Sequence, residues 1–299
     1  MLLQRIITGL ILAAMSLAAV FYLEIEQFAL FVGVLVTLSA WEWSRLANCE
    51  KRWQQFLYAG FVGLFPFLAM GFLAILTLST NELVQTISFF TAEFLFILSL
   101  FFLVASPLMW TLALIKLVRY QHEKNPQLGF KCFLGLWFLT AALIALVFLK
   151  EMGIEWLLCL FGLVWIADIG AFFVGRAFGK HKLADKISPG KTLEGALGAI
   201  IFGGAFALGF ALWKTDEIMS ILVFVGLGIV TVIFSIVGDL LESLFKRQKN
   251  MKDSSQLLPG HGGFLDRLDS IIAAAPIFFV GLSLLKEMQL LTFLNYAVD

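Results

Sequence analysis

Three aspartates in the C-terminal third of the chain have the residue type and spacing of a metal-assisted transfer site. Asp239 lies within an apolar run, whereas Asp266 and Asp269 follow a Pro-Gly-His-Gly-Gly segment and stand three residues apart. That spacing places the last two on one face of a helix. Carboxylates are hard ligands, and Mg²⁺ binds one or two of them together with substrate phosphate oxygens. We therefore expect Asp239, Asp266 and Asp269 to hold Mg²⁺ for phosphoryl or nucleotidyl transfer.

Basic residues and glycines near these acids could hold a polyanionic substrate. They lie mainly on two polar loops, 176–194 and 244–269. The Gly-Lys-Thr tripeptide that ends at Thr192 does not make a P-loop, because the upstream glycine of that motif is replaced by Asp185. We predict a catalytic role for Lys246. The predicted substrate-binding residues are Arg176, Ser188, Lys191, Thr192, Arg247, Lys252, His261, Gly262, Gly263 and Arg267.

Two of the polar residues need separate comment. Asp168 is a further acid within an apolar run, and ionisable groups inside a membrane commonly face a cavity or a partner. We therefore predict a functional role for Asp168 as an intramembrane acid. For His261 two roles stay open, an acid–base group and a brace for its own loop.

The elements that must position these residues are built for a lipid bilayer. Of the 299 residues, 61% are hydrophobic and 14% are charged, and the mean hydropathy is +0.94. A soluble domain is roughly half apolar and about a quarter charged, so the sequence predicts an integral membrane protein. Lys and Arg balance Asp and Glu at 21 each, and we expect no nucleic-acid partner. The three cysteines lack metal-site spacing, and we expect them to be reduced.

Nine apolar runs reach or approach the length of about 20 residues that a helix needs to cross a bilayer. They predict an all-α, polytopic fold with a cytoplasmic N-terminus and a periplasmic C-terminus. Almost all of the 21 Lys and Arg residues then face the cytoplasm, as the positive-inside rule requires, and the active site lies at that face. The runs are approximately 6–22, 27–43, 56–78, 89–115, 132–149, 156–175, 195–213, 218–243 and 270–293.

The polar residues also divide the chain into two regions. Residues 1–150, with about five spans, have few polar groups within their apolar runs and are predicted to form a scaffold. Residues 151–299, with about four spans, are predicted to form the catalytic region, because they carry both polar loops.

Small side chains recur at every fourth residue of the run that follows the first loop. Such a repeat is typical of a helix face that packs closely against another helix. The helix that packs against this face could belong to the same chain or to a second copy of the chain in a homodimer. The residues of this face are Gly195, Ala199, Gly203 and Ala207.

The polar segment resembles a known family signature. It reads Ser-Leu-Phe-Lys-Arg at 243–247, Lys-Asp at 252–253 and Pro-Gly-His-Gly-Gly-Phe-Leu-Asp-Arg-Leu-Asp at 259–269. This matches the signature of the phosphatidate cytidylyltransferases, or CDP-diacylglycerol synthases, without a departure. The Ser-Pro-Gly-Lys-Thr run at 188–192 is similar to another segment of that family.

The resemblance implies a reaction in phospholipid biosynthesis. Phosphatidate and CTP would give CDP-diacylglycerol and pyrophosphate with Mg²⁺ as cofactor. Whether a second cation, K⁺ or Mg²⁺, is also bound stays open. The division of the basic residues between CTP and the lipid phosphate also stays open. The acyl chains would remain among the membrane lipids. A multi-pass protein of the bacterial inner membrane is expected, because no targeting segment is recognised and the positive charges favour one side.

A cation-coupled membrane transporter is the alternative. Asp168 and Asp239 would then form a cation path through the bilayer. Transporters often show a repeat between their two halves, and we recognise none here. The Gly-His-Gly-Gly loop also has no role in a transporter, so the enzyme hypothesis accounts for more of the sequence.

Overall fold

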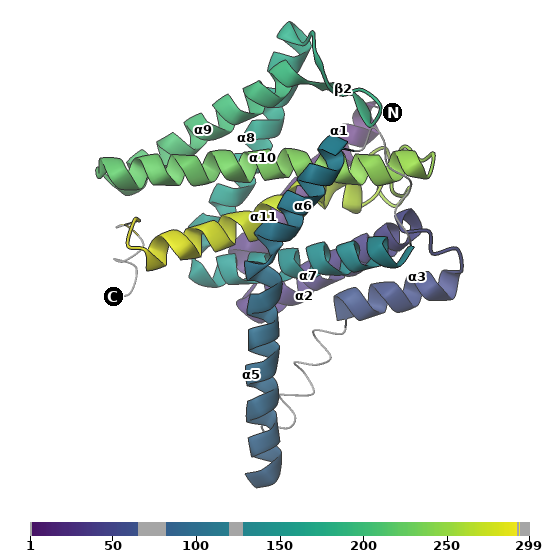
Figure 1. Ribbon diagram of the computed structural model, residues 1–299, viewed down its shortest axis with the longest axis vertical. Coiled ribbons are helices and arrows are strands. Elements are labelled where there is room, and N and C mark those ends of the chain that lie inside the picture. The colour runs from purple at the N-terminus through teal and green to yellow at the C-terminus, as the bar shows by residue number, and fades with distance from the viewer. Residues whose placement is uncertain (1, 65–81, 120–127, 292, 294–299) are drawn as a thin grey trace. The chain divides into compact units, whose positions relative to one another are not determined.

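The protein is almost entirely helical in a computed structural model that describes residues 2–64, 82–119, 128–291 and 293 (Figure 1), which confirms the expected all-α class. A π-helical turn, η1 (Gly60–Leu64), follows α3, and a hairpin of β1 (Lys182–Ala184) and β2 (Ser188–Thr192) connects α8 to α9. The helices are α1 (Leu2–Tyr22), α2 (Ile25–Leu46), α3 (Arg52–Ala59), α5 (Glu82–Val104), α6 (Ser106–Arg119), α7 (Leu128–Met152), α8 (Ile154–Phe178), α9 (Leu193–Lys214), α10 (Ile218–Gln248) and α11 (Leu265–Glu287).

Seven stretches of the described residues are long and apolar enough to cross a membrane, which indicates a multi-pass membrane protein. Six of them are the helices α2, α7, α8, α9, α10 and α11, and the seventh, Thr91–Val118, runs through α5 and α6. Thr8–Tyr22 of α1 is apolar but shorter. The predicted span 56–78 lies outside the described residues from position 65 onward. The number of nine spans therefore stays a prediction.

The chain forms two compact units that alternate along the sequence. The second unit comprises Pro107–Glu123, Phe148–Lys252 and Leu268–Asp299, and the first comprises Met1–Ser106, Lys124–Val147 and Asp253–Arg267. The Gly-His-Gly-Gly segment thus belongs to the same unit as the N-terminal helices, although it lies in the predicted catalytic region. Helix α11 starts in the first unit and continues in the second.

In the second unit, α9 packs along both α8 and α10, as Figure 1 shows. A Cβ on Gly170 of α8 would lie 2.7 Å from the Phe202 Cβ of α9. A Cβ on Gly203 of α9 would lie 2.5 Å from Val232 of α10. Since real Cβ atoms do not come this close to another atom, both approaches depend on glycine. Of the two glycines, Gly203 belongs to the small-residue repeat, which predicts close packing of this kind.

The small-residue face of α9 is used within the chain. All four of its residues are buried in the second unit. Gly195 lies against the Ala171 carbonyl of α8, and Ala207 lies against Gly228 of α10. The chain itself therefore covers this face, and a homodimer stays a prediction.

The first polar loop, 176–194, contains a short antiparallel hairpin that its sequence does not predict. Lys182 pairs with Thr192 and Ala184 with Ser188. The Thr192 Oγ1 then accepts a hydrogen bond of 3.1 Å from the Gly195 N–H and caps α9, as threonine commonly does at a helix start. The Ser-Pro-Gly-Lys-Thr sequence of β2 is poor in strand-forming residues, which is why the strand was not expected.

The core of the first unit joins α2 to α7. The Trp43 Nε1 donates a hydrogen bond of 2.9 Å to the Lys131 carbonyl. Its ring lies edge-on to Phe138, with the ring centroids 6.4 Å apart, and a Cβ on Gly135 would overlap the indole. These contacts fix the C-terminal turns of α2, where Glu42 precedes Trp43.

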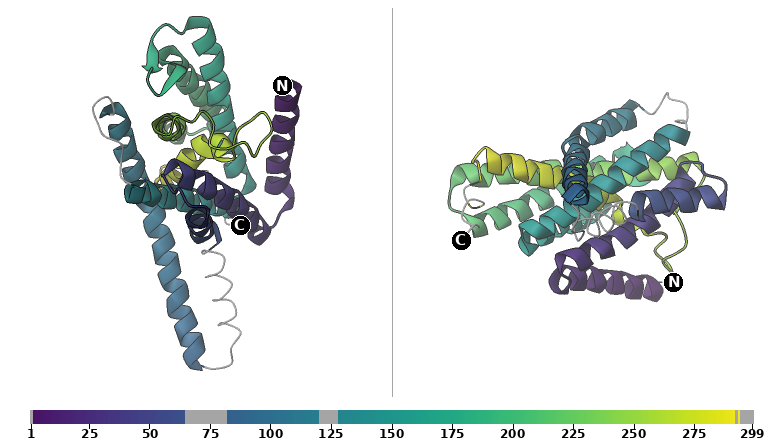
Figure 2. Two further views of the ribbon diagram at one scale, coloured as in Figure 1. Left: turned by 90° about the vertical axis from the view of Figure 1, so that its right-hand side faces the viewer. Right: turned by 90° about the horizontal axis from the view of Figure 1, so that it is seen from below.

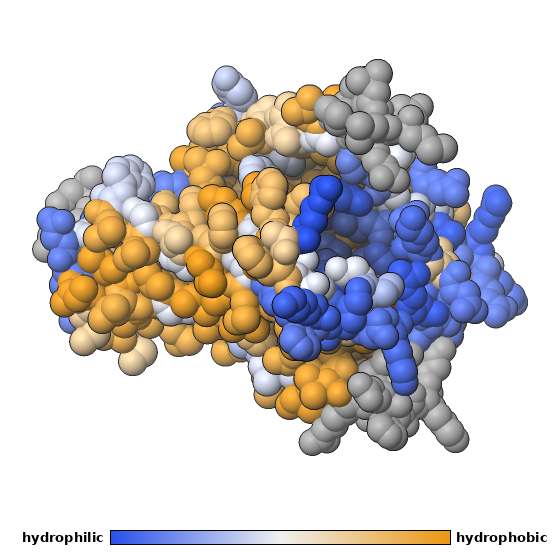
Figure 3. Space-filling view, turned by 90° about the horizontal axis from the view of Figure 1, so that it is seen from above, coloured by the Kyte–Doolittle hydropathy of each residue, from blue (hydrophilic) through white to orange (hydrophobic). Residues whose placement is uncertain are grey.

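Exposed side chains separate by hydropathy. Large apolar side chains such as Phe172 and Phe173 of α8 and Leu197 and Ile201 of α9 are exposed, on helices that Figure 2 shows from two further directions. In Figure 3, hydrophobic side chains cover a broad area and hydrophilic side chains gather in another. This separation is typical of helices that contact lipid along their length and water near their ends.

Candidate active site

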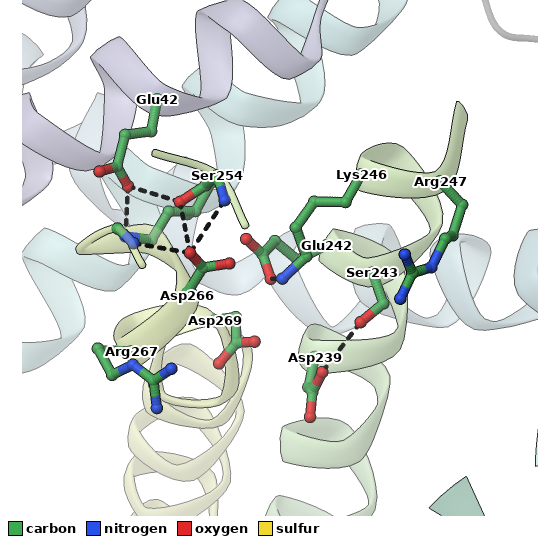
Figure 4. A network of polar contacts seen from close by, with 12 residues as sticks. Glu42, Asp239, Glu242, Ser243, Lys246, Arg247, Ser254, Asp266, Arg267 and Asp269 are labelled. Carbon is green, nitrogen blue, oxygen red and sulfur yellow. Dashed lines mark hydrogen bonds and ion pairs between the residues drawn. The ribbon is translucent and has the colours of Figure 1, made fainter. Parts of the chain in front are cut away.

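Asp239 of α10 lies at the centre of a polar cluster in the second unit. Its carboxylate forms an ion pair with Lys191 of β2, and its Oδ1 accepts a hydrogen bond of 3.2 Å from Ser243 Oγ (Figure 4). The Lys191 and Asp239 side chains are 28% and 32% exposed, so a ligand can reach the pair. Two predicted site residues from different elements are thereby brought together.

Asp269 of α11 faces the same cluster from a second helix. Its carboxylate interacts electrostatically with Asp239, Lys191 and Lys246, and Figure 4 shows it pointing toward Asp239. The helices come close because a Cβ on Gly238 of α10 would overlap the Asp269 carbonyl oxygen. The carboxylates of Asp239 and Asp269, which come from two helices, therefore lie near Lys191 of β2 and Lys246 of α10.

Lys246 and Arg247, at the end of α10, make different contacts. The Lys246 Nζ lies 2.5 Å from Oε2 of Glu242, which is one turn earlier and 2% exposed. The Arg247 Nε donates a hydrogen bond of 3.1 Å to the Ile187 carbonyl, between the two strands. Arg247 thus holds the hairpin that carries Lys191 against α10, whereas Lys246 contributes positive charge beside Asp269.

Thr192 is buried as the cap of α9, whereas the other predicted residues of the second unit lie at its surface. Arg176 and Lys252 are exposed, and Ser188 in β2 is partly exposed. The Arg176 guanidinium carbon lies 5.9 Å from the centroid of the Phe172 ring. Asp168 is exposed on α8. The structure therefore places Asp168 on an outer surface of this unit, and its predicted function stays a prediction.

In the first unit, Gly262 and Gly263 make room for a carboxylate. The Asp266 Oδ2 accepts hydrogen bonds from the Gly263 N–H at 2.7 Å and the Ser254 N–H at 2.9 Å. Gly262 has a φ of +81°, and a Cβ on it would lie 2.5 Å from the Asp266 Oδ2. Glycine is therefore required here for both its backbone angle and its lack of a side chain.

Glu42 of α2, for which the sequence suggested no role, completes the start of α11. The side chain is 0% exposed. Its Oε1 accepts from the Phe264 N–H at 3.1 Å and from Ser255 Oγ at 2.5 Å. Its Oε2 accepts from the Leu265 N–H at 2.7 Å and from Ser254 Oγ at 3.0 Å, as Figure 4 shows in part. The helix N-terminus, which favours an anion, is therefore served by a carboxylate of the protein itself.

The turn between α10 and α11 is held by further contacts within the first unit. The Arg267 Nε and Nη2 donate hydrogen bonds of 3.1 and 2.9 Å to the His261 carbonyl. The Thr8 Oγ1 of α1 donates a hydrogen bond of 3.1 Å to the Pro259 carbonyl. The His261 carbonyl thus helps to hold this turn, but the contact does not involve the imidazole, so both of the roles left open for His261 stay predictions.

Comparison with known proteins identifies the family to which the chain belongs. The model of the cytidylyltransferase family matches residues 3–285. A phosphatidate cytidylyltransferase of Pseudomonas aeruginosa is 41% identical over 283 residues, which cover 93% of this chain and 96% of that protein. The chain belongs to the cytidylyltransferase family. The protein of that name from Haemophilus influenzae is 36% identical over 298 residues, covering 93% of this chain and 97% of its own. Its counterpart from Aquifex aeolicus is 37% identical over 151 residues, or 50% of this chain and 56% of its own.

Membership of the cytidylyltransferase family makes the chain a nucleotidyltransferase, as the signature at 243–269 predicted. The alternative of a cation-coupled transporter is therefore wrong. The relatives are bacterial proteins. Together with the seven apolar helices, they indicate a multi-pass protein of a bacterial membrane.

The acids of this cytidylyltransferase can be compared with the needs of a divalent cation. No group of three or more His, Cys, Asp or Glu side chains suited to a metal occurs in the part of the chain that the structure describes. Mg²⁺, however, usually takes one or two carboxylates and completes its shell with water and substrate phosphates. Asp239 and Asp269 fit this requirement, because their hard oxygens converge from two helices. Asp266 commits its Oδ2 to backbone and serine donors, and its role as a ligand stays a prediction.

One signal in the sequence could have pointed to Glu42. It lies within the second predicted span, between Trp41 and Trp43. Like Asp168 and Asp239, Glu42 is an acid within an apolar run, and such an acid needs a partner. The identity of its partners, more than 200 residues away along the chain, could not have been read from the sequence.

Proposed function

We propose that the chain is a phosphatidate cytidylyltransferase that transfers CMP from CTP to phosphatidate. A phosphate oxygen of phosphatidate attacks the α-phosphorus of CTP and forms a new P–O bond. The bond from the α-phosphorus to the bridging oxygen breaks, pyrophosphate leaves with that oxygen, and CDP-diacylglycerol remains. The observation that carries the proposal is the ion pair of Lys191 with Asp239 beside Asp269. In this arrangement the two carboxylates could bind a metal ion, and the lysine ammonium group could bind a phosphate of the metal-bound triphosphate. The name shared by the relatives supports the lipid substrate.

Positioning and charge neutralisation would account for most of the catalysis. Both substrates are polyanions that repel each other, and the basic residues would hold them in line. Lys191 would exchange Asp239 for a phosphate of CTP, and Lys246 would add positive charge near Asp269. The lipid phosphate is already anionic near pH 7, since its second pKa is about 6, so no strong base is required. The further substrate contacts that we propose are Arg176, Ser188, Thr192, Arg247, Lys252, His261, Gly262, Gly263 and Arg267.

Asp239 and Asp269 would hold Mg²⁺ in this proposal. Asp266, one turn before Asp269 on α11, is the third proposed ligand. When bound, Mg²⁺ would neutralise charge on the triphosphate and favour the departure of pyrophosphate. A second cation, K⁺ or Mg²⁺, belongs to the same proposal.

The proposed setting is the cytoplasmic face of the bacterial inner membrane, with nine spans, a cytoplasmic N-terminus and a periplasmic C-terminus. The distribution of Lys and Arg along the sequence supports this orientation. CTP would reach the site from the cytoplasm, while the acyl chains of phosphatidate stay in the bilayer. A membrane-embedded enzyme is suited to such a pair of substrates.

Release of pyrophosphate tests the proposal. Purified protein in detergent is supplied with Mg²⁺, phosphatidate and each of the four nucleoside triphosphates in turn. We expect release with CTP alone, and none when diacylglycerol, which lacks the attacking phosphate, replaces phosphatidate. Failure to release pyrophosphate with any nucleotide would refute the proposal.

A further inference from the structure

Glu42 joins two segments of the first unit that are distant in sequence. Its helix, α2, belongs to the region predicted as scaffold, whereas Ser254 lies 212 residues further along the chain. We infer that Glu42 is a positioning residue for the Asp266 carboxylate. It fixes the first turn of α11 and shares the Ser254 hydroxyl with Asp266. The inference rests on the proposed function in one respect, the assignment of Asp266 as a metal ligand.

The shared hydroxyl links the two acids directly. Ser254 Oγ lies 3.0 Å from Glu42 Oε2 and 3.0 Å from Asp266 Oδ2, as Figure 4 shows. A serine hydroxyl donates one proton, so it can donate to one of the two carboxylates at a time. A substitution of Glu42 that changes how it engages this hydroxyl therefore also changes the hydrogen bond that the hydroxyl offers to Asp266.

The second link runs through the backbone. The N–H groups of Phe264 and Leu265 donate to Glu42, and the preceding N–H of Gly263 donates to Asp266. Three consecutive N–H groups at the start of α11 are thus divided between the two acids. Because Asp266 lies in the first turn of that helix, the direction of its side chain depends on the turn that Glu42 holds.

Glu42 itself is not placed as a metal ligand. Each of its carboxylate oxygens accepts one backbone N–H and one serine hydroxyl. Donors of this kind stabilise a negative charge and leave the carboxylate with its hydrogen-bonding needs met. Its influence on a bound metal must therefore pass through the groups that it orients, as outer partners of metal ligands commonly act.

A carboxylate is needed here because an amide cannot serve both sides. In a Glu42→Gln variant, one terminal atom remains an acceptor, and the other becomes an NH₂ donor. A serine hydroxyl can turn and accept from that NH₂, but a backbone N–H cannot. Either Phe264 or Leu265 therefore loses its acceptor, and the first turn of α11 shifts or frays.

Mn²⁺ binding to the purified protein tests the inference without turnover. Free Mn²⁺ is measured by electron paramagnetic resonance for wild type, for Glu42→Gln and for Glu26→Gln, which removes an exposed acid from the same helix. We expect Glu42→Gln to raise the Mn²⁺ dissociation constant by about tenfold or more, as loss of an outer partner of a metal ligand does. Glu26→Gln should bind as wild type does. Wild-type Mn²⁺ affinity in a folded Glu42→Gln protein overturns the inference.

A comparison of Ser254→Ala with Ser255→Ala covers the case in which Glu42→Gln does not fold. Both serines donate to Glu42, but the Ser254 hydroxyl also reaches Asp266. We expect Ser254→Ala to weaken Mn²⁺ binding clearly more than Ser255→Ala. Equal effects would mean that Glu42 acts only as a cap of α11, and would overturn the link.

Steady-state kinetics separate positioning from stability. A variant that is merely less folded shows a lower kcat at every Mg²⁺ concentration. If Glu42 positions Asp266, the variant needs more Mg²⁺ for half-maximal pyrophosphate release, and its kcat recovers at high Mg²⁺. A wild-type protein that releases no pyrophosphate would count against the proposed function, while the Mn²⁺ titration would still decide the role of Glu42.

Discussion

Gly238 of α10 packs directly against the backbone of Asp269 in α11. A Cβ on Gly238 would overlap the Asp269 carbonyl oxygen and lie 2.8 Å from the Ala273 Cβ. This close approach brings the Asp269 side chain to the helix that carries Asp239, one residue after Gly238. The separation of two helices, and with it the distance between two proposed metal ligands, therefore depends on the absence of one methyl group.

We expect Gly238→Ala to impair both stability and activity. The added methyl forces α10 and α11 apart, and overpacking of this kind costs about 1–3 kcal/mol of unfolding free energy. Gly226→Ala is a matched control on the same helix, because a Cβ there meets nothing within 4 Å. Thermal unfolding in detergent and pyrophosphate release should decline for Gly238→Ala and remain near wild type for Gly226→Ala. Equal behaviour of the two variants would show that the approach of the helices is not needed.

Replacement of Lys191 tests the proposed triphosphate contact. We expect Lys191→Ala to raise the KM for CTP by about tenfold or more, since a hydrogen bond to a charged group contributes about 1.5–3 kcal/mol. Lys186→Ala removes an exposed lysine from the same hairpin and should leave the KM unchanged. The measurement is the initial rate of pyrophosphate release as CTP is varied. An unchanged KM for CTP in Lys191→Ala would show that Lys191 pairs with Asp239 but does not contact the triphosphate.

Much of the candidate site could be predicted from the sequence because its residues break a strong local pattern. Asp239 and Asp269 are acids in or beside apolar runs. Placing a charged side chain in a membrane costs free energy, so such acids stand out in the sequence as candidates for a functional site. Lys191 was found through its glycine-bearing basic loop. The structure places these residues in one cluster, while their roles stay predictions. Helices such as α8 and α10 could also be predicted, because long apolar runs leave few other structures open to the chain.

What the sequence could not supply depends on contacts between distant segments. Gly262 and Gly263 were predicted to bind substrate, and the sequence did not indicate that they also make room for Asp266 and Glu42. The periodicity of small residues on α9 predicts close packing but does not name the partner helix. The strand β2 forms against β1 despite its Pro-Gly sequence, because pairing and the cap at Thr192 outweigh its low propensity.

A conservative change of Asp269 tests the metal assignment within the second unit. Asp269→Asn keeps the size of the side chain and removes its negative charge. We expect kcat to fall by about 100-fold or more, since a metal ion stabilises the transition state by several kcal/mol. Asp216→Asn, an exposed acid before α10, is the control for loss of charge. Full activity in a folded Asp269→Asn protein would remove Asp269 from the site.

A substitution of Gly263 tests the hydrogen-bond network around Glu42 in the first unit. A Cβ there would overlap Ser254 Oγ and both carboxylate oxygens of Glu42. These atoms cannot simply move aside, because Glu42 is buried and holds the N–H groups at the start of α11.

We therefore expect Gly263→Ala to lower the free energy of unfolding by about 1–3 kcal/mol, the range for a buried polar group that loses its partners. Gly129→Ala, an exposed position in the same unit with nothing within 4 Å of its Cβ, should have little effect. Denaturant unfolding in detergent measures the difference. If Gly263→Ala were as stable as wild type, Glu42 and Ser254 would have to rearrange readily, and the tight network at the start of α11 could not be what holds Asp266 in place.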